Sequence, residues 1–286
     1  MKYLSISLVA LLPAVLLCCY IYVKDRKEKE PIGLLVTLFV LGATLFVPVI
    51  KIENILIGVA DTIMKSQMEF GVGGISGFTS TAAEIKHGLL CGFFATAFVE
   101  EVVIWSVLIM ATSKNNNFNY LFDGIVYAVF LVLGFAAMEN VFYAIRDGWG
   151  VFVLRSLTSV PAHMTFGVLM GFCYTMWHTN YIAQSLEQYY ANEGIIKIER
   201  PCNCWGWFLG SIVLPVIVHG GYSFLRYFSS NIINIIFCVF VLVLYIACFI
   251  IVHNLSDSDN ANESVAFDVL VRKYPALRAR KNSLKH

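Results

Sequence analysis

The stretch from Gly88 to Met110 reads GLLCGFFATAFVEEVVIWSVLIM, and it places two adjacent glutamates inside an otherwise apolar run. The run has the length that a helix needs to cross the hydrocarbon core of a bilayer, about 20 residues at 1.5 Å each. An ionisable side chain near the middle of such a helix costs about 2.5–3.5 kcal/mol on insertion scales. Glu100 and Glu101 therefore indicate a transmembrane helix that carries a function.

The composition extends this interpretation to the whole chain. Of the 286 residues, 58% are hydrophobic and only 14% are charged, which is unlike a soluble domain. The net charge of +1 gives no support for nucleic-acid binding. The sequence predicts an all-α, polytopic membrane bundle of about seven transmembrane helices, at residues 4–23, 32–50, 88–110, 124–145, 157–177, 206–228 and 231–252.

The segment Ile52–Phe70 is more polar than these spans. Asp61, Lys65 and Glu69 interrupt it, and its apolar residues fall at helical spacing. This pattern favours an interfacial amphipathic helix. The alternative is an extension of the second span.

The distribution of Lys and Arg predicts the orientation of the bundle. Most of the 20 basic residues fall in cytoplasmic segments if the N-terminus lies outside, because the first loop and the tail are basic. We therefore expect a membrane domain over residues 1–253 and a polar, then basic, cytoplasmic tail over residues 254–286. A basic tail of this kind is expected to lie on anionic lipid.

Five ionisable side chains fall well inside the predicted spans: Glu100, Glu101, Glu139, His163 and His219. With seven spans, they form one layer in the outer half of the membrane. Neighbouring carboxyls in a low dielectric allow one to stay protonated while another acts as a base. An imidazole can orient the water or stabilise an oxyanion. This layer predicts proton transfer and water activation.

Other interpretations of the same residues stay open. His and Glu also bind zinc, so the sequence requires no cofactor but does not separate a bare carboxylate mechanism from a metal-assisted one. The polar groups are also suited to hydrogen bonding between helices. A G-x-S-G string at Gly74–Gly77 contains Ser76, but such strings arise easily in a Gly- and Ser-rich loop. The H-E-x-x-H motif is absent from the sequence, which argues against a zincin-like site. The remaining histidines, His87, His178, His253 and His286, are expected to be ordinary.

Taken in order, these motifs resemble the PrsW glutamic intramembrane proteases, which are relatives of the type II CAAX prenyl endopeptidases and of abortive-infection-like proteins. The similarity covers roughly residues 20–228. It comprises YVKDRKEKEP at Tyr22–Pro31, FVEEVVIW at Phe98–Trp105, F-x-x-x-E at Phe135 and Glu139, RSLTSVPAH ending at His163, and VHGGYSF around His219.

The resemblance implies a helical bundle in which a glutamate activates water for peptide hydrolysis. Glu100 and Glu101 would be base and partner, Glu139 and His163 would complete the polar core, and His219 would help to hold the water or the oxyanion. Ser223, Phe135 and Asn140 are predicted to support them. The family role implies the first, outer-side cleavage of a single-pass anti-sigma factor in a bacterial plasma membrane, which starts a stress response.

Two positions depart from the family pattern. Ile104 stands where a lysine often follows the glutamate pair, and Ser223 stands where an aspartate or asparagine often follows His219. A cation that lowers a glutamate pKa is therefore missing from position 104. These departures leave room for a shifted substrate preference. They also leave room for the alternative hypothesis, a non-catalytic or immunity-type membrane protein that binds a peptide or a lipid through the same polar core.

Overall fold

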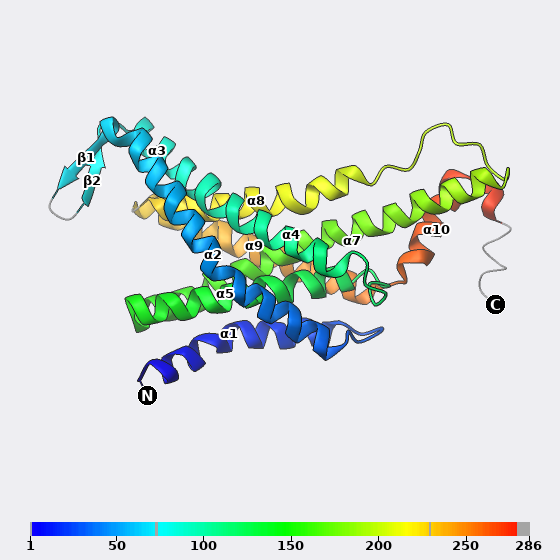
Figure 1. Cartoon of the computed structure of the whole chain (residues 1–286), viewed down its shortest axis with the longest axis horizontal. Coiled ribbons are helices and arrows are strands. Elements are labelled where there is room, and N and C mark those ends of the chain that lie inside the picture. The colour runs from blue at the N-terminus through cyan, green and yellow to red at the C-terminus, as the bar shows by residue number, and fades with distance from the viewer. Residues whose placement is uncertain (1, 72–73, 229, 279–286) are drawn as a thin grey trace.

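The chain folds into an elongated bundle of long helices, shown in Figure 1 as a computed structural model that describes residues 2–71, 74–228 and 230–278. The elements, in chain order, are α1 (Lys2–Lys24), α2 (Ile32–Met64), η1 (Lys65–Gln67), β1 (Met68–Gly71), β2 (Gly74–Phe78), α3 (Thr81–Leu89), η2 (Leu90–Ala97), α4 (Phe98–Thr112), α5 (Asp123–Asp147), α6 (Trp149–Leu157), α7 (Ser159–Asn192), α8 (Trp205–Tyr227), α9 (Asn231–Asp257), α10 (Asn262–Lys273) and η3 (Pro275–Leu277).

The bundle is a multi-pass membrane protein, as the composition predicts. Within the described residues, six helical stretches are long and apolar enough to cross a membrane: Ile6–Lys24, Ile32–Gln67, Thr81–Thr112, Asp123–Asp147, Trp205–Tyr227 and Asn231–Asp257. The predicted span at residues 157–177 lies in α7, which is not among the six. This helix packs between α5 and α8 in the interior of the bundle, so it carries polar side chains that lipid never contacts.

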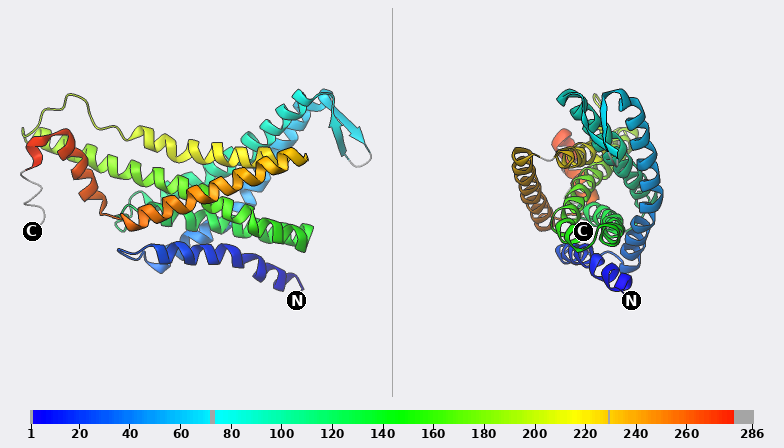
Figure 2. Two further views of the ribbon diagram at one scale, coloured as in Figure 1. Left: turned by 180° about the vertical axis from the view of Figure 1, so that it is seen from behind. Right: turned by 90° about the vertical axis from the view of Figure 1, so that its left-hand side faces the viewer.

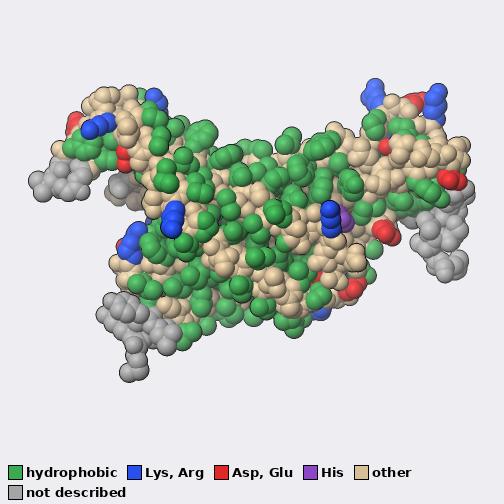
Figure 3. Space-filling view, viewed as in Figure 1, with side chains coloured by type: hydrophobic (Ala, Val, Ile, Leu, Met, Phe, Trp, Pro, Cys, Tyr) green, Lys and Arg blue, Asp and Glu red, His purple; other side chains and the backbone are tan. Residues whose placement is uncertain are grey.

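The surface has the polarity of a membrane protein. In Figure 3 the hydrophobic side chains cover the middle of the visible face, whereas most charged side chains gather toward its two ends. Many large apolar residues on the outer helices are exposed, among them Leu16, Ile55 and Ile235. Such a surface is stable only against the acyl chains of a bilayer.

The core is built around α5, because most residues of this helix are buried. Small residues let its neighbours approach closely. A Cβ atom at Gly42 of α2 would overlap the carbonyl of Leu131, and one at Gly134 of α5 would overlap the carbonyl of Phe39. These two glycines therefore set the α2–α5 crossing against which the polar centre is assembled.

The prediction of an interfacial helix at Ile52–Phe70 is wrong, and the alternative extension of the second span is right. Helix α2 continues through Pro48 to Met64. It remains helical because Ile55 and Ile63 face outward as apolar, lipid-compatible side chains, and because Asp61 pairs with a histidine of α3. The chain then turns through η1 into the antiparallel hairpin β1–β2, which projects from the bundle (Figure 1).

The two ends of the bundle differ. Figures 1 and 2 place the start of α1 at one end and α10 at the other. Helix α10 packs on the last turns of α7 through a small separate core that includes Ala183, Leu270 and Val271. The ion pair between Lys273 and the buried Glu187, at 2.6 Å, fastens α10 to α7.

Candidate active site

A polar cavity of about 410 Å³ lies between helices α4 to α8, toward the end of the bundle where α5 and α8 finish. Its depth follows from helix geometry. Glu139 lies eight residues before the end of α5, and His219 lies eight residues before the end of α8, so both lie about 12 Å from those ends. The cavity is lined by Thr96, Glu100, Glu139, Tyr143, Arg146, Asp147, Val151, Arg155, Ser159, His163, His219, Tyr222, Ser223, Arg226 and Tyr227.

The glutamate pair is positioned by an irregular turn. Residues Leu90–Ala97 form a π-helix immediately before α4, and such segments often occur at functional sites. The wide turn packs tightly on α8, because a Cβ atom at Gly220 would overlap the ring of Phe93. The two carboxylates point to different places. Glu100 lines the cavity, and Glu101 is fully buried behind it.

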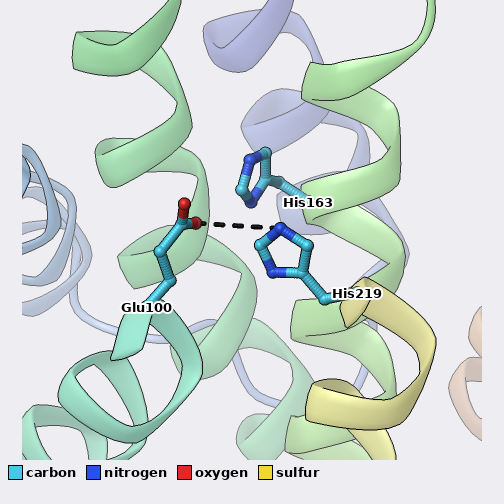
Figure 4. Close-up of side chains that lie close together, drawn as sticks. All are labelled: Glu100, His163 and His219. Atoms are coloured by element: carbon cyan, nitrogen blue, oxygen red, sulfur yellow. Dashed lines mark ion pairs between the residues drawn. The ribbon is translucent and has the colours of Figure 1, made fainter. Parts of the chain in front are cut away.

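Three side chains from three helices meet in the cavity. Glu100 of α4, His163 of α7 and His219 of α8 each offer a ligand atom, and these atoms all lie within 4.8 Å of one another. Figure 4 shows the carboxylate and the two imidazoles pointing toward one another. All three residues are only 3% exposed, so water is scarce around them and their mutual interactions are strong.

Glu101 orients His219. The carboxylate oxygen Oε1 of Glu101 lies 2.8 Å from Nδ1 of His219 and accepts a hydrogen bond from it. The other ring nitrogen, Nε2, then faces Oε2 of Glu100 at 4.0 Å. The ring of Phe166 stacks on His219 at 4.5 Å between centroids. The imidazole is thus held in one orientation and one tautomer, as the ligand or base of an active site needs to be.

Glu139 of α5 lines the same cavity and pairs with a cation, Arg155. Its Oε2 lies 3.1 Å from Nε2 of His163 and 2.5 Å from Nη2 of Arg155. Arg155 is buried and begins the RSLTSVPAH motif. The sequence does not reveal its role, because a basic residue in the last turn of α6 looks like an ordinary helix end. The missing cation at Ile104 is thus not replaced beside the glutamate pair. Ile104 is fully buried in the apolar core, and Arg155 serves Glu139 instead.

A further carboxyl was missed as well. Glu53 of α2 forms a hydrogen bond with Glu100, and the closest signal in the sequence is a lone acidic residue within the apolar stretch before Ile55. Oxygen atoms of both side chains remain buried and without a hydrogen-bond partner among the described residues. The hydrogen bond between Glu53 and Glu100 requires a proton on one of the two carboxyls. Four acidic groups thus converge on one arginine and two histidines, and a bound cation could take the place of that proton.

The predicted supporting residues lie in different places. Ser223 lines the cavity, one turn after His219. Phe135 is buried in the core, and its ring lies 6.0 Å from that of His163. Asn140 points away from the site, because its amide donates to the carbonyl of Ala10 at 2.9 Å. Ser76 lies on the hairpin, and its side chain is outside the described part of the structure.

The three clustered donors fit a divalent metal ion. Two histidines and one carboxylate are a common donor set of catalytic zinc, which keeps a fourth position for water. His219 has the second hydrogen bond, to Glu101, that a metal-binding histidine usually makes. Oε2 of Glu100 is buried and makes no hydrogen bond among the described residues, which leaves it free to bind an ion. Glu100, His163 and His219 are therefore the residues that would hold the ion.

A membrane-embedded bundle with a polar cavity that is lined by carboxylates and imidazoles is typical of intramembrane hydrolases. A family model described as PrsW family intramembrane metalloprotease matches residues 30–252, and the chain belongs to this family. It is an intramembrane protease.

Curated relatives agree with this assignment. The chain is 31% identical to Protease PrsW of Oceanobacillus iheyensis over 246 residues, which is 85% of this chain and 92% of that protein. It is 29% identical to Protease PrsW of Bacillus subtilis over 219 residues, 77% of this chain and 81% of that protein. It is also 29% identical to Protease PrsW of Clostridioides difficile over 246 residues, 85% and 87% of the two chains. No solved structure matches the chain.

Proposed function

We propose that this protease hydrolyses a single-pass membrane protein of the anti-sigma-factor type near its outer membrane boundary, in a bacterial plasma membrane. The observation that carries the proposal is the buried cluster of Glu100, His163 and His219 at the inner end of a polar cavity. The family assignment supports proteolysis, and the cluster supports hydrolysis by a water molecule held among these three groups.

Each residue has a part in this proposed reaction. Glu100 would take up the proton of the reacting water, because its Oε2 makes no hydrogen bond among the described residues. Glu101 keeps His219 oriented, and Arg155 pairs with Glu139, which in turn holds His163. The free ring nitrogens of the two imidazoles carry lone pairs, so an imidazole first takes up a proton and then, as a donor, stabilises the oxyanion that develops on the reacting carbonyl. A divalent ion held by the same three donors would polarise the carbonyl and acidify the water.

The expected orientation supports cleavage at the outer side. The cavity lies toward the end of the bundle where α1 starts (Figure 1), which is outside if the basic loop and tail are cytoplasmic. The cluster lies about 12 Å from the ends of α5 and α8, so the scissile bond would lie in the outer half of a hydrocarbon core about 30 Å thick.

The test uses the purified protein in liposomes with a panel of single-pass anti-sigma factors. Mass spectrometry of the fragments locates the cut, which we expect in the outer half of the transmembrane segment. A chelator arm decides the role of Glu100. If the chelator abolishes cleavage and zinc restores it, Glu100 is a metal ligand. If cleavage is unchanged by the chelator, Glu100 is the general base. A cut at the cytoplasmic end, or no cleavage of any panel member by a folded sample, would contradict the proposal.

A further inference from the structure

A second polar cluster joins three helices next to the catalytic cavity. His87 of α3 is 4% exposed, and both of its ring nitrogens are engaged. Nε2 lies 2.7 Å from Oδ1 of Asp61 on α2, and Nδ1 lies 2.6 Å from the hydroxyl of Tyr227 on α8. The expectation that His87 is an ordinary residue at a span end is therefore wrong.

The cluster is connected to the site through Tyr227. This residue lines the cavity together with Ser223 and His219, and the three are spaced four residues apart on one face of α8. Tyr227 is eight residues, or about 12 Å, beyond His219 along the helix. An extended peptide covers that distance with about four residues. A substrate that reaches Glu100, His163 and His219 in extended form would therefore pass Tyr227.

The hydrogen bonds fix what Tyr227 offers to such a peptide. The carboxylate of Asp61 accepts the proton of Nε2, so Nδ1 of His87 carries the lone pair and the tyrosine hydroxyl donates to it. The hydroxyl proton is then committed, and only the oxygen lone pairs remain free. The rings of Phe78 and Tyr227 pack against the imidazole, at 5.2 and 5.5 Å between centroids, and prevent its rotation.

We propose that Tyr227 is a substrate-binding residue of the protease, and that Asp61 and His87 are positioning residues that act through it. The oxygen of Tyr227 accepts a hydrogen bond from an N–H group of an extended substrate segment, about four residues from the scissile bond. This inference rests on the proposed proteolytic function, and it adds the place where the substrate is held outside the reacting bond.

The experiment is a double-mutant cycle on steady-state cleavage of the single-pass protein that the wild type cleaves. Tyr227→Phe removes the hydroxyl, and His87→Phe keeps a ring of similar shape but frees the hydroxyl to rotate. We expect each variant to raise KM about fivefold with kcat changed less than twofold, the effect of one lost hydrogen bond in binding. The double variant should also show about a fivefold rise, because His87 acts only through Tyr227.

Tyr174→Phe is the matched control. It removes a buried hydroxyl, bonded to Thr112 at 2.8 Å, that lies outside the cavity. Its KM should equal that of the wild type. Unchanged KM in Tyr227→Phe, or independent effects that multiply to about 25-fold in the double variant, would overturn the inference and leave the cluster as a purely structural link between helices. Absence of cleavage by the wild type would instead refute the proposed function.

Discussion

Replacement of Arg155 by methionine should destabilise the protein strongly, because it strands a buried carboxylate. The side chains of Arg155 and Glu139 are only 10% and 12% exposed, and their charged atoms lie 2.5 Å apart. Removal of one partner of a buried pair typically costs about 3–5 kcal/mol. His163, at 3.1 Å, still serves Glu139, so we expect the lower end of this range, about 3 kcal/mol.

Unfolding of the purified protein in mixed micelles, followed by tryptophan fluorescence, measures this change. Glu139→Gln alone should also destabilise, because it strands the arginine. The double variant, Arg155→Met with Glu139→Gln, should recover about 2 kcal/mol relative to the sum of the single effects. Wild-type stability of Arg155→Met, or simple addition in the double variant, would refute the assignment of Arg155 as the cation that holds Glu139.

Three further predictions concern residues outside the cluster. Burial raises the pKa of Glu30, in the first loop, from 4.5 to about 7, so the folded state binds the extra proton and the free energy of unfolding should fall as the pH rises through that window. Glu30→Gln should flatten this slope in thermal unfolding between pH 4.5 and 7.5. Asn140→Ala should cost about 1 kcal/mol of stability, measured by denaturant unfolding, because the Ala10 carbonyl loses its donor. Lys273→Met strands the buried Glu187, so hydrogen exchange in α10 should become faster while exchange in α5 is unchanged.

The part of the fold that follows from local composition could be predicted. The run around Glu100 is apolar over a membrane thickness, and the same holds for most other spans. The sequence predicts a second span that ends at residue 50, because Asp61 and Lys65 look interfacial when each is judged alone. In the structure Asp61 is compensated by His87, 26 residues further on, and no local pattern contains that pairing.

The candidate site, like the fold, could be predicted only in part. Isolated polar groups within apolar runs are costly, and this alone singles out five residues in the sequence. The structure brings all five together: Glu100, Glu101, Glu139, His163 and His219. The pairing of Arg155 with Glu139 and the place of Glu53 could not be predicted, because their partners lie on other helices. Which glutamate faces the cavity depends on the π-helix before α4, and the sequence carries no periodic signal for that turn.

The most direct measurement is cleavage of one single-pass substrate in liposomes by the wild type, by Glu100→Gln and by the matched control Glu263→Gln, whose carboxylate is exposed on α10. All three proteins should be folded and inserted alike. The account predicts that the wild type and Glu263→Gln release the same fragment and that Glu100→Gln releases at least about a hundredfold less. Cleavage by Glu100→Gln at the wild-type rate would contradict the claim that the cluster of Glu100, His163 and His219 is the hydrolytic centre.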